Sequence, residues 1–211
     1  MLRPVLRGRD IGRFRANWAG LWLIDTHNGY GKTQPVNVDD YTAVKVYLDQ
    51  FYPKLDKRQD QGVTPYNLRN CAYHGEFKKE KLLWIDLSEQ GRFAYDAGEM
   101  FCVNSAYMMT GHSIKYLSTV LNSTLVTWFM RNSALNSGMG TTRWVRFTVE
   151  RIPIPIVQDK SQQPFIQLMD RISQVTDMEE IKKEKLEAEI DGLVNSLYGL
   201  TEAEVQAVTR K

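Results

Sequence analysis

LSTVLNSTLVTWFMRNSALNSGMGTTRWVRFTVERIPIPI, residues 117–156, is the stretch around which the chain is organised. Its first part has apolar residues at helical spacing and, with Ser113 as the capping residue, predicts one helix that continues to about residue 131. The polar, glycine-containing residues 136–142 predict a loop. The pair Asn122-Ser123 interrupts the apolar face of the helix, so these side chains need hydrogen-bond partners if they are buried.

A short alternating segment follows the loop. It predicts a strand that carries both Arg143 and Arg146. Pro153 and Pro155 fix their own φ angles and restrict the residues before them, so they predict a stiff exit from this region. The sequence therefore divides at this point.

The charges differ on the two sides of this division. Residues 1–155 contain 20 Lys and Arg against 14 Asp and Glu, whereas residues 156–211 contain 7 against 11. The balance is +6 before the division and −4 after it, although the whole chain carries only +2. A basic face can attract a polyanion even when the net charge is small. We predict a basic mixed domain over residues 1–157 and an acidic helical arm over residues 158–211.

The first region predicts an α+β fold that is rich in strands and has helices packed on it. We expect strands over residues 18–24, 82–87, 93–95 and 100–109, the first of them buried. Helical spacing predicts a helix over residues 41–51. Its core-facing side chains would be Val44, Tyr47, Leu48 and Phe51.

The second region predicts a helical hairpin or a coiled-coil-like arm. Asp177 with Glu180, and Thr201 with Glu204, match the capping-box pattern at helix starts. Two sets of apolar residues recur at helical spacing before and within the arm's second helix. These faces consist of Phe165, Leu168, Ile172 and Val175, and of Leu186, Ile190, Leu193, Val194 and Leu197.

Several kinds of catalytic site find no support in the sequence. The Gly-Lys-Thr at residues 31–33 resembles the end of a phosphate-binding loop, but Thr26 stands where that motif requires glycine. His27, His74 and His112 have no metal-ligand spacing with Cys, Asp or Glu, so each is expected to be satisfied within the fold or exposed. We therefore expect that this chain catalyses no reaction alone.

Cys71 and Cys102 form neither a CxxC pair nor a disulfide framework. We expect two buried thiols in a reducing compartment. The N-terminus has no apolar core of a secretory signal, and no run approaches the ~18 to 20 apolar residues that span a bilayer. The expected location is the cytoplasm.

Five short motifs together resemble one family. They are VLRGRDI at residues 5–11, KLLWID at 81–86, LNS at 121–123, RIPIP at 151–155 and EIDGLVNSLYGLT at 189–201. In this order and spacing they are similar to the TaqI-like C-terminal specificity domain. That domain is the target-recognition domain of type IIG restriction-modification enzymes and related adenine-specific DNA methyltransferases.

The resemblance implies that residues 1–157 form a target-recognition domain for double-stranded DNA and that the chain is itself non-catalytic. It also implies a methyltransferase domain, often with a nuclease, N-terminal to this segment. That domain would bind S-adenosylmethionine and flip the target base. Thr124 and Asn195 stand where the family often has lysine and tyrosine.

Basic and hydroxyl side chains are the candidates for DNA contact. Lysine and arginine neutralise phosphates, arginine also pairs with guanine, and threonine can donate to a phosphate or a base. A scaffold module that works through its acidic arm, a fragment like a type I specificity subunit, and a nuclease with an unrecognised site are the alternative interpretations. The predicted DNA-binding residues are Arg7, Arg9, Lys32, Arg58, Arg69, Lys78, Lys79, Thr141, Thr142, Arg143 and Arg146.

Overall fold

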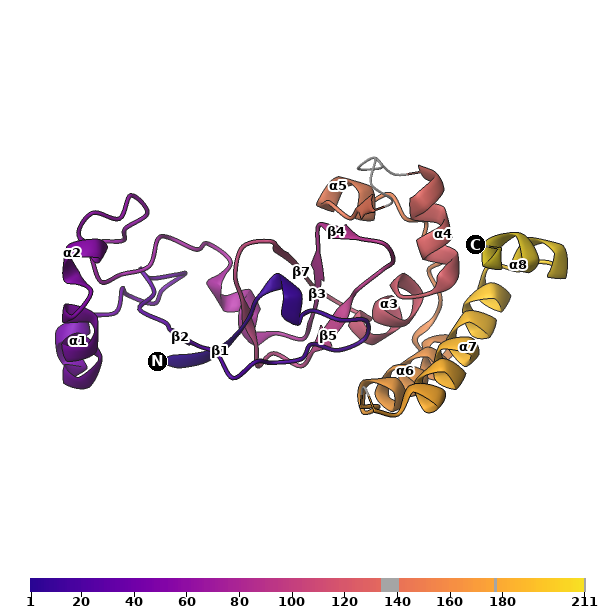
Figure 1. Ribbon diagram of the computed structural model, residues 1–211, viewed down its shortest axis with the longest axis horizontal. Coiled ribbons are helices and arrows are strands. Elements are labelled where there is room, and N and C mark those ends of the chain that lie inside the picture. The colour runs from indigo at the N-terminus through magenta and orange to yellow at the C-terminus, as the bar shows by residue number, and fades with distance from the viewer. Residues whose placement is uncertain (134–140, 177, 211) are drawn as a thin grey trace.

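The computed structural model describes residues 1–133, 141–176 and 178–210. Figure 1 shows an elongated molecule with three parts in a row. A small lobe with α1 (Thr42–Asp49) and α2 (Tyr52–Leu55) lies at one end, strands occupy the middle, and the C-terminal helices lie at the other end. The predicted α+β fold is confirmed.

Short strands build the middle of the molecule. They are β1 (Leu2–Leu6), β2 (Trp22–Ile24), β3 (Lys81–Ile85), β4 (Leu87–Ser88), β5 (Ala94–Asp96), β6 (Phe101–Cys102), β7 (Ala106–Thr110) and β8 (Thr142–Arg143). The central sheet has the order β5-β3-β7 and is antiparallel. A second sheet has the order β2-β1-β6, in which β1 is antiparallel to β2 and parallel to β6. The strands β4 and β8 form an antiparallel pair.

The other elements are helical turns and helices. They are the 3-10 turns η1 (Gly8–Asp10), η2 (Val38–Asp40) and η3 (His74–Lys78), and the helices α3 (Ile114–Leu121), α4 (Thr124–Ser133), α5 (Arg146–Val149), α6 (Asp159–Ser173), α7 (Glu180–Leu197) and α8 (Glu202–Thr209). The predicted capping box of Thr201 and Glu204 is present at α8. Asp177 lies outside the described residues. None of the helices described is long and apolar enough to cross a membrane.

One large core joins the central sheet to the helices. The ring of Tyr116 on α3 meets that of Phe165 on α6 edge-on at 5.1 Å, and Thr119 donates to the Phe165 carbonyl at 3.0 Å. Burying one such side chain stabilises the fold by roughly 1.5–3 kcal/mol. The core contains residues from both sides of residue 157, among them Leu82, Trp84, Phe93, Val120, Met130, Trp144, Leu168, Met169, Ile190 and Val194. The division into two domains at that residue stays a prediction.

The single helix predicted over 113–131 is wrong, because Asn122 and Ser123 divide it into α3 and α4. Both side chains are buried and hydrogen-bond to the backbone. Ser123 donates to the Val120 carbonyl at 2.7 Å and accepts from the Val126 amide at 3.3 Å, so it caps the start of α4. Ser113 precedes α3 with a positive φ of 60° and makes no side-chain cap, contrary to prediction.

The N-terminal lobe is more exposed than predicted. The buried strand expected over 18–24 is only the three residues of β2, and Trp18 and Trp22 are exposed. Gly20 has a φ of +73°, which turns the chain before β2. No residue of α1 is buried, and Tyr47 and Phe51 are exposed. The helix packs against η2 at the end of the molecule (Figure 1).

Two further predictions about strands are wrong. The segment 100–109 forms β6 and β7 rather than one strand, because the chain turns at Ser105, which has a φ of 77°. Consequently β6 pairs with β1, whereas β7 joins the central sheet. The strand expected to carry two arginines contains only Arg143, and Arg146 begins the short helix α5. The strands predicted over 82–87 and 93–95 are confirmed with small shifts of their ends.

Candidate nucleic-acid interface

An open groove of about 520 Å³ lies beside the turn between β6 and β7. Three segments that are distant in the sequence line it: the η1 turn, the link from β3 to β4, and the β6–β7 turn. Tyr107 supplies one aromatic wall, and its ring stacks on Trp84 at 5.3 Å. The groove is also lined by Arg9, Asp86, Asn104 and Ser105.

Arg7 and Arg9 flank the glycine of η1 but differ in their contacts. The guanidinium of Arg7 holds both carboxylate oxygens of Asp10 at 2.7 and 2.9 Å, and these hydrogen bonds lower the pKa of Asp10. Asp10 also accepts from the Arg7 amide at 2.8 Å, so this pair fixes the turn. Arg9 is exposed, lines the groove and has no carboxylate partner among the described residues. Of the two, Arg9 is the one available to a ligand.

Arg143 lies next to two residues that line this groove, because it pairs with Leu87 in the β4–β8 ladder and contacts Asp86. Thr142 and Trp144 are buried, and the Trp144 indole donates to the Ser88 carbonyl at 3.1 Å. Arg143 between them is therefore directed outward. Its guanidinium contacts both carboxylate oxygens of Asp86, at 2.6 and 3.2 Å, and these hydrogen bonds raise its pKa. The arginine is thus held in one orientation while remaining half exposed.

The other predicted residues of this stretch occupy different environments. Thr142 pairs with Ser88 in the β4–β8 ladder and is only 1% exposed, so its side chain does not face solvent. Arg146 is highly exposed and contacts Glu150 at 2.7 Å, one helical turn further along. Thr141 is half-buried and has a partner. The predicted loop over 136–142 lies mostly outside the described residues.

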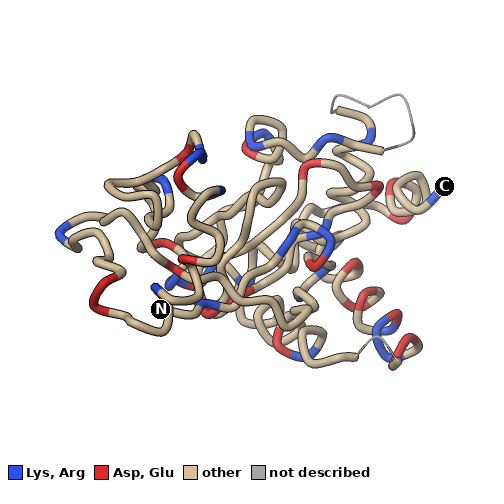
Figure 2. Tube along the Cα trace, turned by 60° about the vertical axis from the view of Figure 1, so that its left-hand side comes forward, with Lys and Arg blue, Asp and Glu red and all other residues tan. Residues whose placement is uncertain are grey.

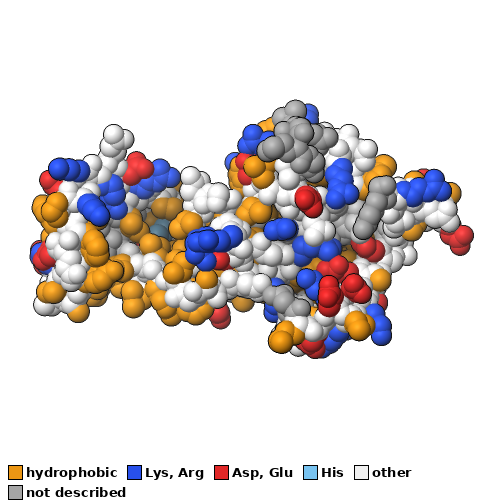
Figure 3. Space-filling model, viewed as in Figure 1, with side chains coloured by type: hydrophobic (Ala, Val, Ile, Leu, Met, Phe, Trp, Pro, Cys, Tyr) orange, Lys and Arg blue, Asp and Glu red, His pale blue; other side chains and the backbone are white. Residues whose placement is uncertain are grey.

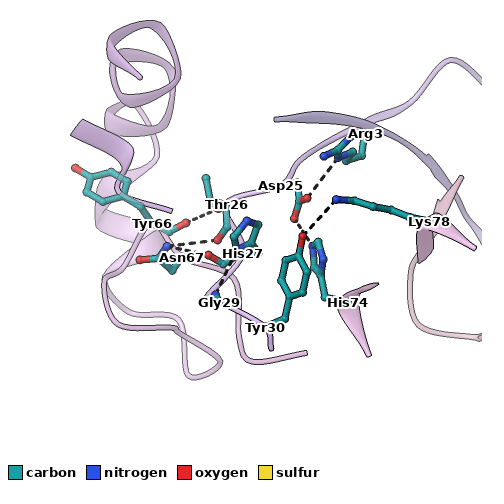
Figure 4. Close-up of polar contacts among 10 residues, drawn as sticks. All are labelled: Arg3, Asp25, Thr26, His27, Gly29, Tyr30, Tyr66, Asn67, His74 and Lys78. Carbon is teal, nitrogen blue, oxygen red and sulfur yellow. Dashed lines mark hydrogen bonds and ion pairs between the residues drawn. The ribbon is translucent and has the colours of Figure 1, made fainter. Parts of the chain in front are cut away.

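The N-terminal lobe is held together by a fully buried asparagine (Figure 4). Asn67 donates to the Val36 carbonyl at 2.8 Å, and Thr26 donates to the Tyr66 carbonyl at 2.7 Å. Arg58 donates to the carbonyls of Pro65 and Asn67 at 3.1 and 2.5 Å. Arg58 therefore uses one terminal nitrogen to close this loop, although it was predicted to contact DNA.

A second cluster joins the lobe to the central strands (Figure 4). His74 of η3 is buried and lies 2.8 Å from Asp25, which follows β2. Tyr30 stacks on His74 with ring centroids 4.1 Å apart, and Lys78 donates to the Tyr30 hydroxyl at 3.3 Å. His27 meets both rings, and burial lowers its pKa, so it is neutral at pH 7. His27 and His74 therefore connect the N-terminal lobe to the central strands.

Three predicted residues lie on the surface near this cluster. Lys32 is exposed on the lobe. Lys79 contacts Glu76 at 2.6 Å, and Arg69 lies 3.6 Å from Asp60 with both side chains largely exposed. Exposed pairs of this kind contribute about 0–1 kcal/mol and leave the cations available to an anion.

A second groove of about 550 Å³ lies on the other side of the β6–β7 turn. Arg69 lines it, and Asn104 and Tyr107 belong to both grooves. Cys71 and Cys102 also line it and are half-buried free thiols rather than the fully buried ones predicted. Burial raises the pKa of Cys102 to about 11 and also raises that of Cys71, so both are thiols at pH 7.

The structure thus places Arg9 in the groove and Arg143 against Asp86, which lines it, whereas Lys32, Arg58 and Arg146 lie elsewhere. In Figure 3 the upper edge of the molecule is hollowed between the N-terminal lobe and the part that carries α5. The helical hairpin carries acidic and basic residues side by side (Figure 2). Sequence reasoning missed Asp86, Asn104 and Tyr107, although KLLWID already contained Asp86 at the end of a strand.

Comparison with known proteins gives the class of this domain. The model of the TaqI-like C-terminal specificity domain matches residues 3–154, which is well over half of the chain. The chain is therefore a specificity domain and belongs to the family of TaqI-like C-terminal specificity domains. The resemblance seen in the sequence motifs is confirmed.

A solved structure has the same fold. It is the type IIL restriction-modification enzyme MmeI in complex with DNA, and its TM-score to this chain is 0.66 at 14% identity. The similarity covers 98% of this chain and 29% of that enzyme, so the chain spans less than a third of the enzyme's length. No curated protein sequence matches the chain.

Proposed function

We propose that this chain binds double-stranded DNA and recognises its sequence for a restriction-modification enzyme of type IIG or type IIS-like organisation, or for a related adenine methyltransferase. The observation that carries this proposal is the match of residues 3–154 to a family of specificity domains. The fold shared with a restriction-modification enzyme solved on DNA supports it.

The geometry of the groove suits recognition of a base edge. A guanidinium held by a carboxylate behind it is pre-organised to make two parallel hydrogen bonds to guanine, and Arg143 on Asp86 has this arrangement. Arg9 lines the groove together with Asp86 and has no carboxylate partner among the described residues, which suits a phosphate. Asn104 at the groove is of the residue type that pairs with adenine.

Methylation and cleavage belong to other parts of the enzyme in this proposal. A methyltransferase region N-terminal to this segment would bind S-adenosylmethionine and flip the target adenine. The chain itself supplies the binding step and works in the cytoplasm, where the DNA is.

Binding to a labelled duplex of random sequence tests the proposal. A protein that contacts 6–10 phosphates loses about 10³–10⁵ in affinity between 50 and 200 mM salt. We expect binding at 50 mM salt that weakens steeply, and selection from a random library should then enrich one sequence. Absence of binding at 50 mM salt, or binding that does not change with salt, would contradict DNA recognition and favour the scaffold interpretation.

A further inference from the structure

A smaller pocket of about 230 Å³ lies apart from both grooves, where the loop after η1 meets the helical hairpin of α6 and α7. Its lining comes from the loop after η1 (residues 12–15 and 17), from residues 90 and 92 of the β4–β5 link, and from the helical hairpin, with Ile172 of α6, Val175 just after α6 and Lys183 of α7. In Figure 1 the indigo loop that follows η1 reaches toward the helices at this place. The pocket therefore forms only when both predicted regions of the chain are packed together.

The charged side chains that line this pocket are all cations. They are Arg13, Arg15, Arg92 and Lys183, and no Asp or Glu is among the lining residues. In Figure 3, Lys and Arg side chains lie in the middle of the visible face, with Asp and Glu side chains beside them toward the helical hairpin. Arg13 is paired with Glu187, but Arg92 and Lys183 have no carboxylate partner among the described residues, so positive charge remains at the pocket that a bound anion offsets.

The backbone fixes the two arginines of the loop. Phe14 has a φ of 65° and a buried side chain, and its amide donates to the Phe93 carbonyl at 3.2 Å. This anchored residue places Arg13 and Arg15 on either side of it. Arg13 contacts Glu187 and the Asn122 carbonyl, each at 2.7 Å, while its buried Nε has no partner among the described residues.

The other two cations are less constrained. Arg92 is exposed and Lys183 is half-buried, and neither has a carboxylate partner among the described residues. Lys183 lies one helical turn before Glu187 on α7, so it is on the side of the helix that faces Arg13. Ile172 and Val175 are buried and form an apolar base. An apolar base below several cations strengthens the attraction for a small anion, because it lowers the local dielectric.

We propose that this pocket is a binding site for a phosphate group, with Arg92 and Lys183 as its main ligands. Its volume of about 230 Å³ leaves room for a tetrahedral anion. The phosphate can come from the DNA backbone or from a free phosphate compound, and the two sources share the same chemistry. The DNA source rests on the proposed function, whereas the phosphate site itself does not.

Two measurements on the full chain test the site. The first is a titration with inorganic phosphate at constant ionic strength, read by thermal unfolding and by chemical-shift changes. The second is the slope of log K against log salt concentration for duplex DNA, in which each phosphate contact contributes about 0.9. The test variant is Arg92→Ser with Lys183→Ser. A Lys160→Ser, Arg210→Ser variant is the control, because it removes the same charge at residues outside the pocket.

We expect phosphate to raise the unfolding temperature of the wild type and the control but not of the pocket variant. If the occupant is a DNA phosphate, the salt slope of the pocket variant also falls by about one or two relative to the control. Loss of the phosphate response with an unchanged slope supports the site and assigns it a free phosphate compound. The proposal is overturned if phosphate still raises the unfolding temperature of the pocket variant. It is also overturned if phosphate does not stabilise the wild type and the salt slope of the pocket variant equals that of the control. If the chain binds no DNA, only the proposed function is contradicted, because the phosphate titration still tests the pocket.

Discussion

The side-chain amide of Asn122 hydrogen-bonds to both backbone groups of Phe93. Its Oδ1 accepts from the Phe93 amide at 3.0 Å, and its Nδ2 donates to the Phe93 carbonyl at 2.8 Å. Asn122 is fully buried, and its own carbonyl accepts from Arg13 at 2.7 Å. The residue that ends α3 therefore also ties the β4–β5 link and the loop after η1 to the helices.

Replacement of Asn122 tests this connection. We expect Asn122→Ala to lower the free energy of unfolding by about 2–4 kcal/mol, because it leaves the buried Phe93 amide without a partner and opens a small cavity. Urea unfolding followed by circular dichroism measures the change. The control is Asn132→Ala, an exposed asparagine on α4 whose side chain donates to the Trp128 carbonyl. Equal losses in the two variants would contradict a special role for Asn122.

A buried ion pair at the start of the central sheet gives a second prediction. Lys81 is fully buried and contacts Asp96, which also accepts from the amides of Gly98 and Glu99 at 3.0 and 3.1 Å. Lys81→Met removes one partner and leaves a buried carboxylate, so we expect a loss of about 3–5 kcal/mol. Urea unfolding again measures it.

A double change separates charge from packing at this pair. Lys81→Met combined with Asp96→Asn leaves no unpaired charge, while the asparagine oxygen still accepts from the turn amides. We expect the double variant to be more stable than Lys81→Met alone. A double variant that is less stable than the single one would show that packing around Lys81, rather than its charge, determines the loss.

Local sequence patterns predicted the parts of this fold that depend on local physics. The spacing of apolar residues and the residues typical of helix ends predict the strand beginning at Lys81, the helices around Phe165 and Ile190, and the capping box at Thr201. The need for partners at Asn122 was also visible, because polar groups interrupted an apolar face. Its partner Phe93 was not visible, since that contact depends on the packing of distant segments.

The candidate site was less predictable for the same reason. Arg143 was selected from its position after a glycine-containing loop, but its carboxylate partner Asp86 is 57 residues earlier in the chain. Arg58 carries the same charge and instead closes a loop through backbone carbonyls. The sequence shows the charge of each side chain, whereas the availability of that side chain to a ligand depends on its tertiary contacts.

The two cysteines give a prediction about pH. Burial raises the pKa of Cys102 from 9.0 to about 11, so its thiolate fraction at pH 8 is roughly 100-fold lower than in the unfolded chain. We expect iodoacetamide to modify Cys102 about 100-fold more slowly in the folded chain, as measured by mass spectrometry of each cysteine. Because the pKa of Cys102 is higher in the folded chain than in the unfolded chain, the free energy of unfolding falls as the pH rises from about 9 toward 11. Equal rates in folded and urea-unfolded chains would refute the burial of this thiol.

Asp86 provides the sharpest test of how Arg143 acts. If Asp86 orients Arg143 for a base, Asp86→Ala lowers the affinity for the preferred sequence by about 1–3 kcal/mol, since the guanidinium loses its fixed orientation. The same change removes a negative charge near DNA, so it should strengthen binding to random duplexes. Binding isotherms on the two kinds of duplex therefore move in opposite directions. Glu150→Ala, which frees Arg146 in the same way, is the matched control and should strengthen both alike. Equal strengthening of both duplexes by Asp86→Ala would mean that Arg143 contributes only its charge, and that the base reader lies elsewhere in the interface.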